Sequence, residues 1–358
     1  MKKLLFILLI PLFLGGCYDY QELNDLAIIS GIAIDYEDDY EVTFEVLECQ
    51  KENDEKASYV KATGKTISEA FANASLKIHK EGYFAHVKVI LFSEEIAKNY
   101  MQDVTDYILR EPNIRKIFYP LIVLDGKASS ILENKNEASP VTSVALEKAL
   151  TNNRSTPKIA ITMDFETLMN NFVDPKKDAY LNTIKKDETT TFALSGMALF
   201  KDYQMVGQLN EQETSLFNLL KNTSDNTFIK MACPFKEDKT ITIDLYHNRD
   251  TDIKVKEDNI VINSSLKGSV IEDNCEIDFR TSSSYEELSH SFSEEIKKEI
   301  DHLIKKIQNL QSDVLEFQNI YYQKERKELT NWYLKDTLVN IDLDINKNGL
   351  IFEVNPNE

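Results

Sequence analysis

The sequence predicts an α+β fold of more than one domain, with mixed sheets covered by helices and a long amphipathic helix near the C-terminus. Three patterns support this prediction. Strand-like runs alternate with helical segments over residues 26–150, short strand-like segments follow over residues 191–279, and a seam of apolar residues then extends to Phe317. Alternating strands and helices indicate layers of sheet and helix, and a long helix with one apolar face needs another element to cover that face.

The N-terminal half opens with strand-like segments rich in aliphatic and β-branched residues. Strands are predicted at Leu26–Asp35, Tyr40–Cys49, Val60–Lys65, Tyr83–Phe92 and Ile117–Leu124. Thr66 is followed three residues later by Glu69, which is a capping box and predicts the start of a helix. Further helices are predicted from Ser93, at Val104–Leu109, at Ala128–Leu132 and at Val141–Leu150.

The pattern weakens between Thr151 and Thr191, where Lys, Asp, Asn and Thr accumulate. We therefore place a domain boundary near residue 190, between an N-terminal domain (17–190) and a C-terminal region (191–358) that a second boundary near 270–284 would divide. In that region Asn210 and Glu213 form a second capping pair, for a helix that ends near Leu220. Strands are predicted in a hairpin over Thr191–Gln208 and at Thr240–Tyr246, Ile253–Lys256, Ile260–Ile271, Glu276–Phe279 and Leu338–Ile345.

The clearest helix begins near Tyr285. Its apolar seam steps by four and three residues alternately, through Ile296, Ile300, Leu303, Ile307, Leu310, Val314 and Phe317. Both a coiled-coil partner and a sheet beneath the helix fit this spacing. The many strands predicted nearby favour a helix that covers a sheet.

The first residues have the organisation of a secretory signal. Two lysines precede an apolar run, Leu4–Leu14, which is shorter than the roughly 20 residues that a membrane-spanning helix needs. The run ends in Leu-Gly-Gly-Cys, which places two small residues before Cys17. We expect cleavage after Gly16 and covalent diacylglyceryl and N-acyl chains on Cys17, which together would anchor the chain to the outer face of a membrane. An ordinary signal peptide with an incidental cysteine is the alternative.

Charge and cysteine content limit the classes of partner. The net charge is -19, so the surface repels the phosphates of nucleic acids and anionic lipid headgroups. Three cysteines remain after lipidation: Cys49, Cys233 and Cys275. They cannot all pair, and we expect them to serve as small buried apolar residues, with their redox state left open.

Motifs for catalysis or metal binding are incomplete. Asp342–Asn346 with Glu353 resembles a calcium loop, but Lys347 stands where the loop needs glycine. Ser155–Lys158 matches Ser-x-x-Lys without the Ser-Asp-Asn and Lys-Thr-Gly elements that accompany it in penicillin-recognising enzymes. No histidine pair has zinc spacing, and His86 is expected inside a buried strand. We therefore predict that the chain is not an enzyme and binds no metal.

Several blocks resemble one family in their order along the chain. Leu14–Asp35, with Asp19, Glu22 and Leu23 after the cysteine, is similar to the opening of the Ger(x)C lipoproteins, the C subunits of spore germinant receptors. Later blocks with the same likeness are Gly64–Ala70, Phe84–Glu94, Arg110–Arg115, Ala198–Thr214 and Ser312–Phe317. The chain departs from the family at Tyr18, where tryptophan is more usual, and at Glu316 and Gln318, where relatives often carry glycine.

The resemblance implies a multi-domain ectodomain anchored by lipid to the outer surface of the spore inner membrane. Its partners would be the polytopic A- and B-type receptor subunits, and its role would lie in assembly and signalling during germination. No cofactor is implied beyond the lipid on Cys17. Asp19, Glu22 and Leu23 form a candidate partner-docking motif, with a simple spacer as the alternative. A free-standing solute-binding lipoprotein that feeds a transporter is the alternative function, and the nutrient is not identified.

Overall fold

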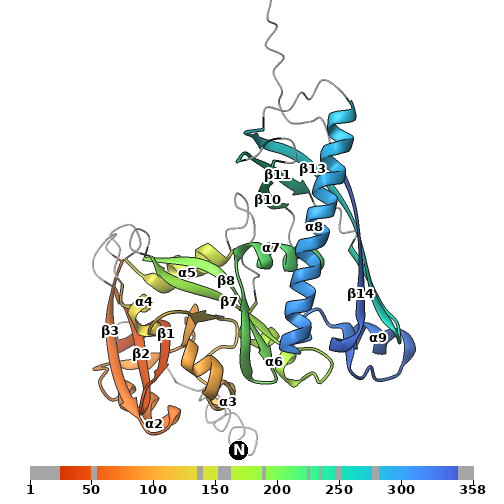
Figure 1. Cartoon of the computed structure of the whole chain (residues 1–358). Helices are drawn as coiled ribbons and strands as arrows, with labels where there is room; N and C mark the ends of the chain where they lie inside the picture. The colour runs from red at the N-terminus through yellow and green to blue at the C-terminus, as the bar shows by residue number, and fades with distance from the viewer. Residues whose placement is uncertain are drawn as a thin grey trace, which may run out of the picture.

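The computed structural model describes residues 25–49, 55–134, 140–151, 163–187, 191–223, 226–233, 236, 238–246, 251–275 and 282–345. Two sheets with helices packed on them make up this part of the chain, in agreement with the α+β prediction (Figure 1).

The first sheet is mixed and carries the N-terminal half of the fold. Its strands are β1 (Leu26–Tyr36), β2 (Tyr40–Cys49), β3 (Glu55–Gly64), β4 (Glu81–Tyr83), β5 (Val89–Ser93), β6 (Tyr119–Val123), β7 (Tyr180–Asp187), β8 (Thr191–Lys201) and β9 (Gln204–Leu209). The order is β3-β2-β1-β5-β6-β7-β8-β9, and β4 pairs with the start of β1. The central strands β1, β5, β6 and β7 are parallel, and the outer strands are antiparallel.

Helices cover both faces of the first sheet, so its central strands are apolar on both sides. One face packs on α4 (Ala128–Leu132) and α5 (Thr142–Thr151), in a core that includes Leu91 and Leu121. The opposite face packs on α2 (Ile67–Ser75), α3 (Met101–Arg110) and α6 (Phe165–Val173). A π-helical turn, η3 (Ile96–Tyr100), runs directly into α3.

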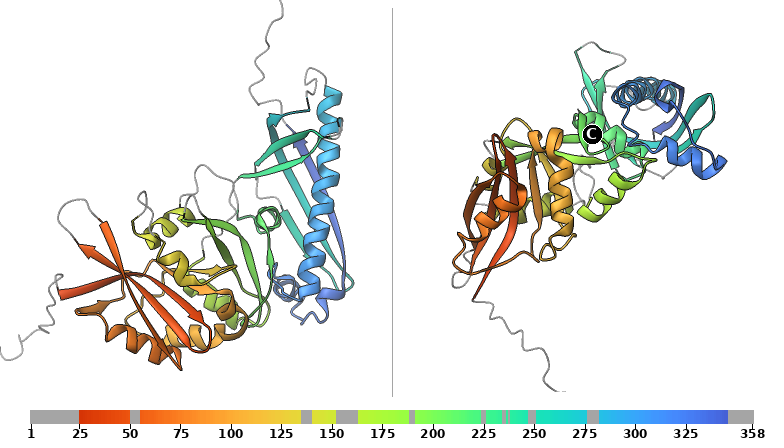
Figure 2. Two further views of the ribbon diagram at one scale, coloured as in Figure 1. Left: turned by 60° about the vertical axis from the view of Figure 1, so that its left-hand side comes forward. Right: turned by 90° about the horizontal axis from the view of Figure 1, so that it is seen from below.

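The second sheet consists of β10 (Asn226–Ala232), β11 (Thr240–Tyr246), β12 (Thr251–Val255), β13 (Asn259–Asp273) and β14 (Asp336–Ile345). Helix α8 (Ser282–Leu310) lies along this sheet beside β14 (Figures 1 and 2). The seam residues from Ile296 to Ile307 are at most 1% exposed, which confirms the prediction of a helix that covers a sheet. Three shorter helices complete the region: α7 (Glu211–Leu220), α9 (Phe317–Glu325) and η4 (Trp332–Leu334).

One apolar core runs through both sheets. It includes Phe44 of β2, Phe200 of β8, Ile243 of β11 and Phe292 of α8. The boundary predicted near residue 190 lies between β7 and β8, which pair along their length. The first sheet therefore includes strands from both sides of that position.

The segment predicted as one strand, Tyr83–Phe92, is two strands separated by a turn. Strand β4 pairs with β1 as far as Ile28, and β5 starts its pairing at Gly31. Tyr83 pairs with Ile28 and Val89 pairs with Gly31, so the chain between β4 and β5 is longer than the stretch of β1 that it runs beside. The extra residues form a turn. His86 lies on this turn and is exposed, so the prediction of a buried histidine was wrong.

Cys233 and Cys275 form a disulfide, with their Cα atoms 5.8 Å apart. That separation lies within the usual range for disulfides. The expectation that the cysteines would serve as unpaired apolar residues was therefore wrong for this pair. The bond joins the end of β10 to the residues just after β13, and Cys49 is the last residue of β2.

Candidate functional site

Within the part of the chain that the structure describes, the candidate motifs from the sequence do not come together in one site. Among the described residues, no group of three or more His, Cys, Asp or Glu side chains could hold a metal ion. Asp342 and Asp344 are exposed on β14 while Leu343 between them is buried, which is the alternation of a strand and not a calcium loop. Ser155–Lys158 and the rest of the calcium-like motif, Asn346, Lys347 and Glu353, lie outside the described residues.

The predicted lipid and docking residues also lie outside the described residues: Gly16, Cys17, Asp19, Glu22 and Leu23. The description begins at Asp25, which is exposed and leads directly into β1. None of the described helices combines the length and the apolar composition that a membrane span requires.

A buried polar cluster lies where the two sheets meet. Residues 311–318, which we call the junction segment, connect α8 to α9. Ser312 and Asp313 in this segment are fully buried. The Asp313 carboxylate accepts hydrogen bonds from the backbone N–H groups of Phe317 and Gln318, both at 2.8 Å. Asp313 therefore caps the first turn of α9, where exposed backbone donors and the helix dipole favour a carboxylate.

Asp178 ties the junction segment to the first sheet. It lies just before β7, and its carboxylate accepts from the backbone N–H of Asp313 at 2.6 Å and from the Lys201 ammonium at 3.3 Å. The backbone N–H of Asp178 donates in return to the carbonyl of Asp313 at 3.3 Å. The Ser312 hydroxyl donates to the carbonyl of Phe200 on β8. Asp178 before β7 and strand β8 of the first sheet region thus hold one segment of the second.

Burial dominates the electrostatics of Asp313. It raises the pKa of this carboxyl to about 6, because the hydrogen bonds from Gln318 and Phe317 only partly offset the loss of hydration. The nearby charge of Asp178 adds to the rise. Asp313 therefore changes its protonation state in mildly acidic solution.

Two ion pairs flank the junction segment. Glu316 and the Lys221 ammonium are 2.5 Å apart, and Lys306 lies 2.7 Å from Glu213 of the second capping box. Burial is the largest single effect and raises the pKa of Glu316, but the charge of Lys221 and the hydrogen bonds from Lys221 and Asn319 together outweigh it, so the pKa is lowered. The contacts of α7 with α8 and α9 therefore include charged pairs as well as apolar packing.

A cavity of about 440 Å³, which we call the junction pocket, opens beside this cluster. Its wall is built by Pro175, Lys176, Lys201, Gln311, Gln318, Tyr322 and residues 328–333. The Lys176 ammonium lies 4.4 Å from the centre of the Tyr322 ring, within the range of a cation–π contact. Both sheet regions thus contribute polar and aromatic groups to one hollow.

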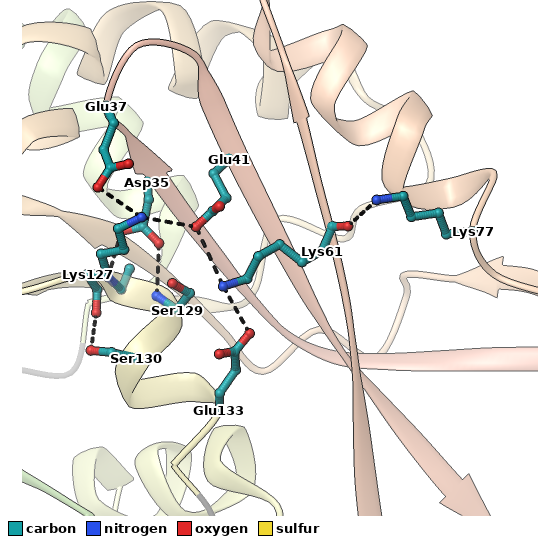
Figure 3. A network of polar contacts seen from close by, with 10 residues as sticks. Asp35, Glu37, Glu41, Lys61, Lys77, Lys127, Ser129, Ser130 and Glu133 are labelled. Carbon is teal, nitrogen blue, oxygen red and sulfur yellow. Dashed lines mark hydrogen bonds and ion pairs between the residues drawn. The ribbon is translucent and has the colours of Figure 1, made fainter.

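A second polar cluster lies on the first sheet and is structural. The buried Asp35 carboxylate accepts from the N–H groups of Ala128 and Ser129 at 2.6 and 3.0 Å, so it caps α4. Figure 3 shows the surrounding ion pairs, in which Lys127 faces Glu37 and Glu41. In the same network Lys61 bridges Glu41 and Glu133 (Figure 3). The capping bonds of Asp35 are already made within the fold, which favours a structural role for this carboxylate.

Glu45 plays the matching role for α5. Its carboxylate is fully buried and accepts from the N–H groups of Thr142 and Ser143 at 2.8 and 3.1 Å. The Ser30 hydroxyl donates to it at 2.9 Å. Burial raises the pKa of Glu45, and these hydrogen bonds lower it in part. Two acidic side chains of the sheet thus fix the starts of two covering helices.

Comparison with known proteins identifies the family. Residues 19–186 match the family described as the spore germination protein N-terminal domain. Residues 195–350 match the family described as spore germination B3/GerAC like, C-terminal. The chain belongs to this family of spore germination proteins. The resemblance to Ger(x)C proteins that the sequence motifs indicated is thereby confirmed.

Individual relatives agree with this assignment. Spore germination protein GerQC of Bacillus cereus is 26% identical over 68% of each chain. Spore germination protein KC of Bacillus subtilis (strain 168) is 25% identical over 95% of this chain and 92% of its own. The crystal structure of the GerBC protein shares the fold, with a TM-score of 0.55, 19% identity and coverage of 91% and 99% of the two chains. The names of these relatives describe germination and no chemical reaction.

The junction cluster is where sequence reasoning was least complete. Asp178 belongs to the region of the N-terminal family match and Asp313 to that of the C-terminal match. The only signal in the sequence was the family block Ser312–Phe317, which does not identify a partner for Asp313. The pairing with Asp178 depends on a contact over 135 positions and becomes visible only in the fold.

Proposed function

We propose that the chain is the lipid-anchored C subunit of a nutrient germinant receptor on the outer surface of the spore inner membrane. Polytopic A- and B-type subunits are its proposed partners, and assembly and signalling of the receptor during germination is its proposed role. The observation that carries the proposal is the match of two germination family regions, in order, over most of the chain. The Leu-Gly-Gly-Cys17 motif before the first region supplies the anchor.

The properties of the chain suit a binding module held away from the membrane surface. Its helix-capping carboxylates serve the fold, and the net charge of -19 keeps the ectodomain away from anionic headgroups. The chain would then reach its membrane partners mainly through the residues nearest the lipid. Asp19, Glu22 and Leu23 are the proposed docking residues for that reason.

Spores that carry Cys17→Ala provide the test. We expect the protein to leave the membrane fraction and the response to a panel of single amino acids and sugars to fall at least about tenfold, because two acyl chains supply the anchoring energy. Cys49→Ala is the matched control and should retain both properties. A protein released from the membrane in spores that still respond fully to every nutrient would instead favour the solute-binding alternative.

The docking residues are tested in separate strains that keep Cys17. Replacement of Asp19, Glu22 and Leu23 by alanine leaves Cys17 in place, so lipid anchoring should persist. Reduced recovery of the polytopic subunits with the variant would support docking. Unchanged recovery would show that the motif is a spacer.

A further inference from the structure

The junction pocket has the size of a ligand site and a wall unlike the rest of the molecule. Its volume of about 440 Å³ falls in the range of small-molecule pockets, which often form between domains. Lys176 and Lys201 line it against the single acidic residue Glu328, in a chain whose net charge is -19. The wall itself therefore has more basic than acidic residues, unlike the whole molecule, and Asp178 behind it offsets the charge of Lys201.

The two lysines are held differently. Lys201 shares its ammonium with Asp178 at 3.3 Å, so part of its charge is already compensated. Lys176 is half-buried, and its ammonium faces the Tyr322 ring and makes no ion pair with a carboxylate of the described residues. A ring face attracts a cation more weakly than a carboxylate does, so the Lys176 ammonium can take an anionic ligand at little cost.

The remaining wall offers flat apolar surface and neutral hydrogen-bonding groups. Tyr322, Trp332 and Tyr333 supply ring surface. Gln311, Gln318 and Asn331 supply side-chain amides, which both donate and accept. This combination suits a ligand with one charged end and one flat or apolar end.

Several residues around the pocket have a left-handed backbone conformation. Gln311, Glu316, Arg326 and Asn331 all have φ between 52° and 63°, in the left-handed region. Gln311 and Asn331 are themselves wall residues. Gln311 follows α8, Arg326 follows α9, and Glu316 and Asn331 are the N-cap residues of α9 and η4, so these left-handed residues mark the turns between the helices. Here they turn the chain so that α9 and η4 face Lys176.

We infer that the junction pocket binds a small organic carboxylate with a flat apolar group, and that Lys176 holds the carboxylate. The ligand would contact both family regions of the chain at once, next to the Asp178–Asp313 contact. Binding would therefore stabilise the junction of the two sheets. A role of this ligand in germination rests on the proposed function, whereas the inference that the pocket binds it is independent of that proposal.

Trp332 makes the inference directly measurable, because it is the only tryptophan in the sequence and it lies in the pocket wall. The full chain, purified in detergent, is titrated with benzoate while tryptophan fluorescence is recorded. Benzamide keeps the ring without the charge, and acetate keeps the charge without the ring. We expect a saturable change with benzoate. Binding should be at least about tenfold (about 1.4 kcal/mol) weaker for benzamide, which loses the charge-assisted contact, and for acetate, which loses the contact of the ring.

Lys176→Met and Lys177→Met form the matched pair of variants. Lys177 is adjacent but does not line the pocket, and its ammonium lies 3.9 Å from Asp174. We expect Lys176→Met to weaken benzoate binding about tenfold and Lys177→Met to leave it unchanged. Three outcomes would overturn the inference: no saturable benzoate signal, equal binding of benzamide, or equal effects of the two variants. None of these depends on a germination assay, so failure here is distinct from failure of the receptor proposal.

Discussion

Asp313→Ala is expected to lower the free energy of unfolding by about 3–5 kcal/mol at pH 5. The change removes the acceptor for two backbone N–H groups at the start of α9, those of Phe317 and Gln318, in a position with no exposure to water. Each buried donor left without a partner costs about 1–3 kcal/mol, and the lost side chain leaves a small cavity. Urea denaturation followed by circular dichroism measures the difference.

The effect of Asp313→Ala should depend on pH in a definite direction. The pKa of Asp313 in the fold is about 6, above its ordinary value of 3.8, so the folded state holds the proton more tightly than the unfolded state. Stability from this group is therefore complete below about pH 4 and falls as pH rises through 6. The difference between wild type and variant should shrink by roughly 2–3 kcal/mol between pH 4 and pH 7.

Asp344→Ala is the control for this series. Asp344 is exposed on β14, so its removal should change stability by less than about 0.5 kcal/mol at either pH. A loss for Asp313→Ala as small as that of the control would mean that the junction segment is not held by this carboxylate. A difference that grows with pH would contradict the assigned direction of the pKa shift.

Glu45→Ala is expected to lower the free energy of unfolding by about 3–4 kcal/mol. Thr142 and Ser143 at the start of α5 lose the acceptor for their N–H groups, and the Ser30 hydroxyl loses the shorter of its two hydrogen bonds to Glu45. The amides of Thr142 and Ser143 should also exchange faster with solvent deuterium than in the wild type, because the end of the helix opens more often.

Glu41→Ala is the matched control on the same strand. Glu41 meets Lys61 and Lys127 at 3.6 and 3.7 Å in the ion-pair network of Figure 3, and such pairs contribute about 0–1 kcal/mol. Glu45→Gln keeps one acceptor oxygen and should fall between the two alanine variants. Equal losses for Glu41→Ala and Glu45→Ala would show that capping by Glu45 is not what holds α5.

Local patterns predicted the regular parts of the fold. The seam of α8 was recognisable because apolar residues repeat with helical spacing from Ile296 to Leu310. The prediction was wrong for Val314 and Phe317, the last two seam residues, which lie beyond the end of α8. Asn210 and Glu213 form the full capping box. At the other predicted box, the Thr66 side chain accepts from the N–H of Glu69, but the Glu69 carboxylate accepts from the N–H of Lys65 and not from that of the N-cap residue Thr66. Capping depends on residues three positions apart, so it can be predicted without the tertiary structure.

Elements whose stability comes from distant contacts were missed. Helix α6 lies in the stretch where the pattern weakened, yet Phe165 stacks on Phe118 with ring centres 4.9 Å apart. Helix α9 has a weak apolar face. Its N-cap residue is Glu316, but the carboxylate that accepts from its first N–H groups belongs to Asp313, three residues earlier. The Cys233–Cys275 bond, like the Asp178–Asp313 contact, joins residues far apart in the sequence, and no local pattern specifies such pairs.

The first sheet contains strands from both sides of residue 190, and this affects how the chain folds during synthesis. Strand β7 ends at Asp187, and its outer edge is completed only by β8, whose own edge is completed by β9. A nascent chain that has reached the end of the first family region therefore still presents an open row of backbone donors and acceptors, which recruits strands from other molecules. Expression of the N-terminal half as a separate fragment should accordingly extend through Leu209, and a fragment cut at residue 187 should aggregate.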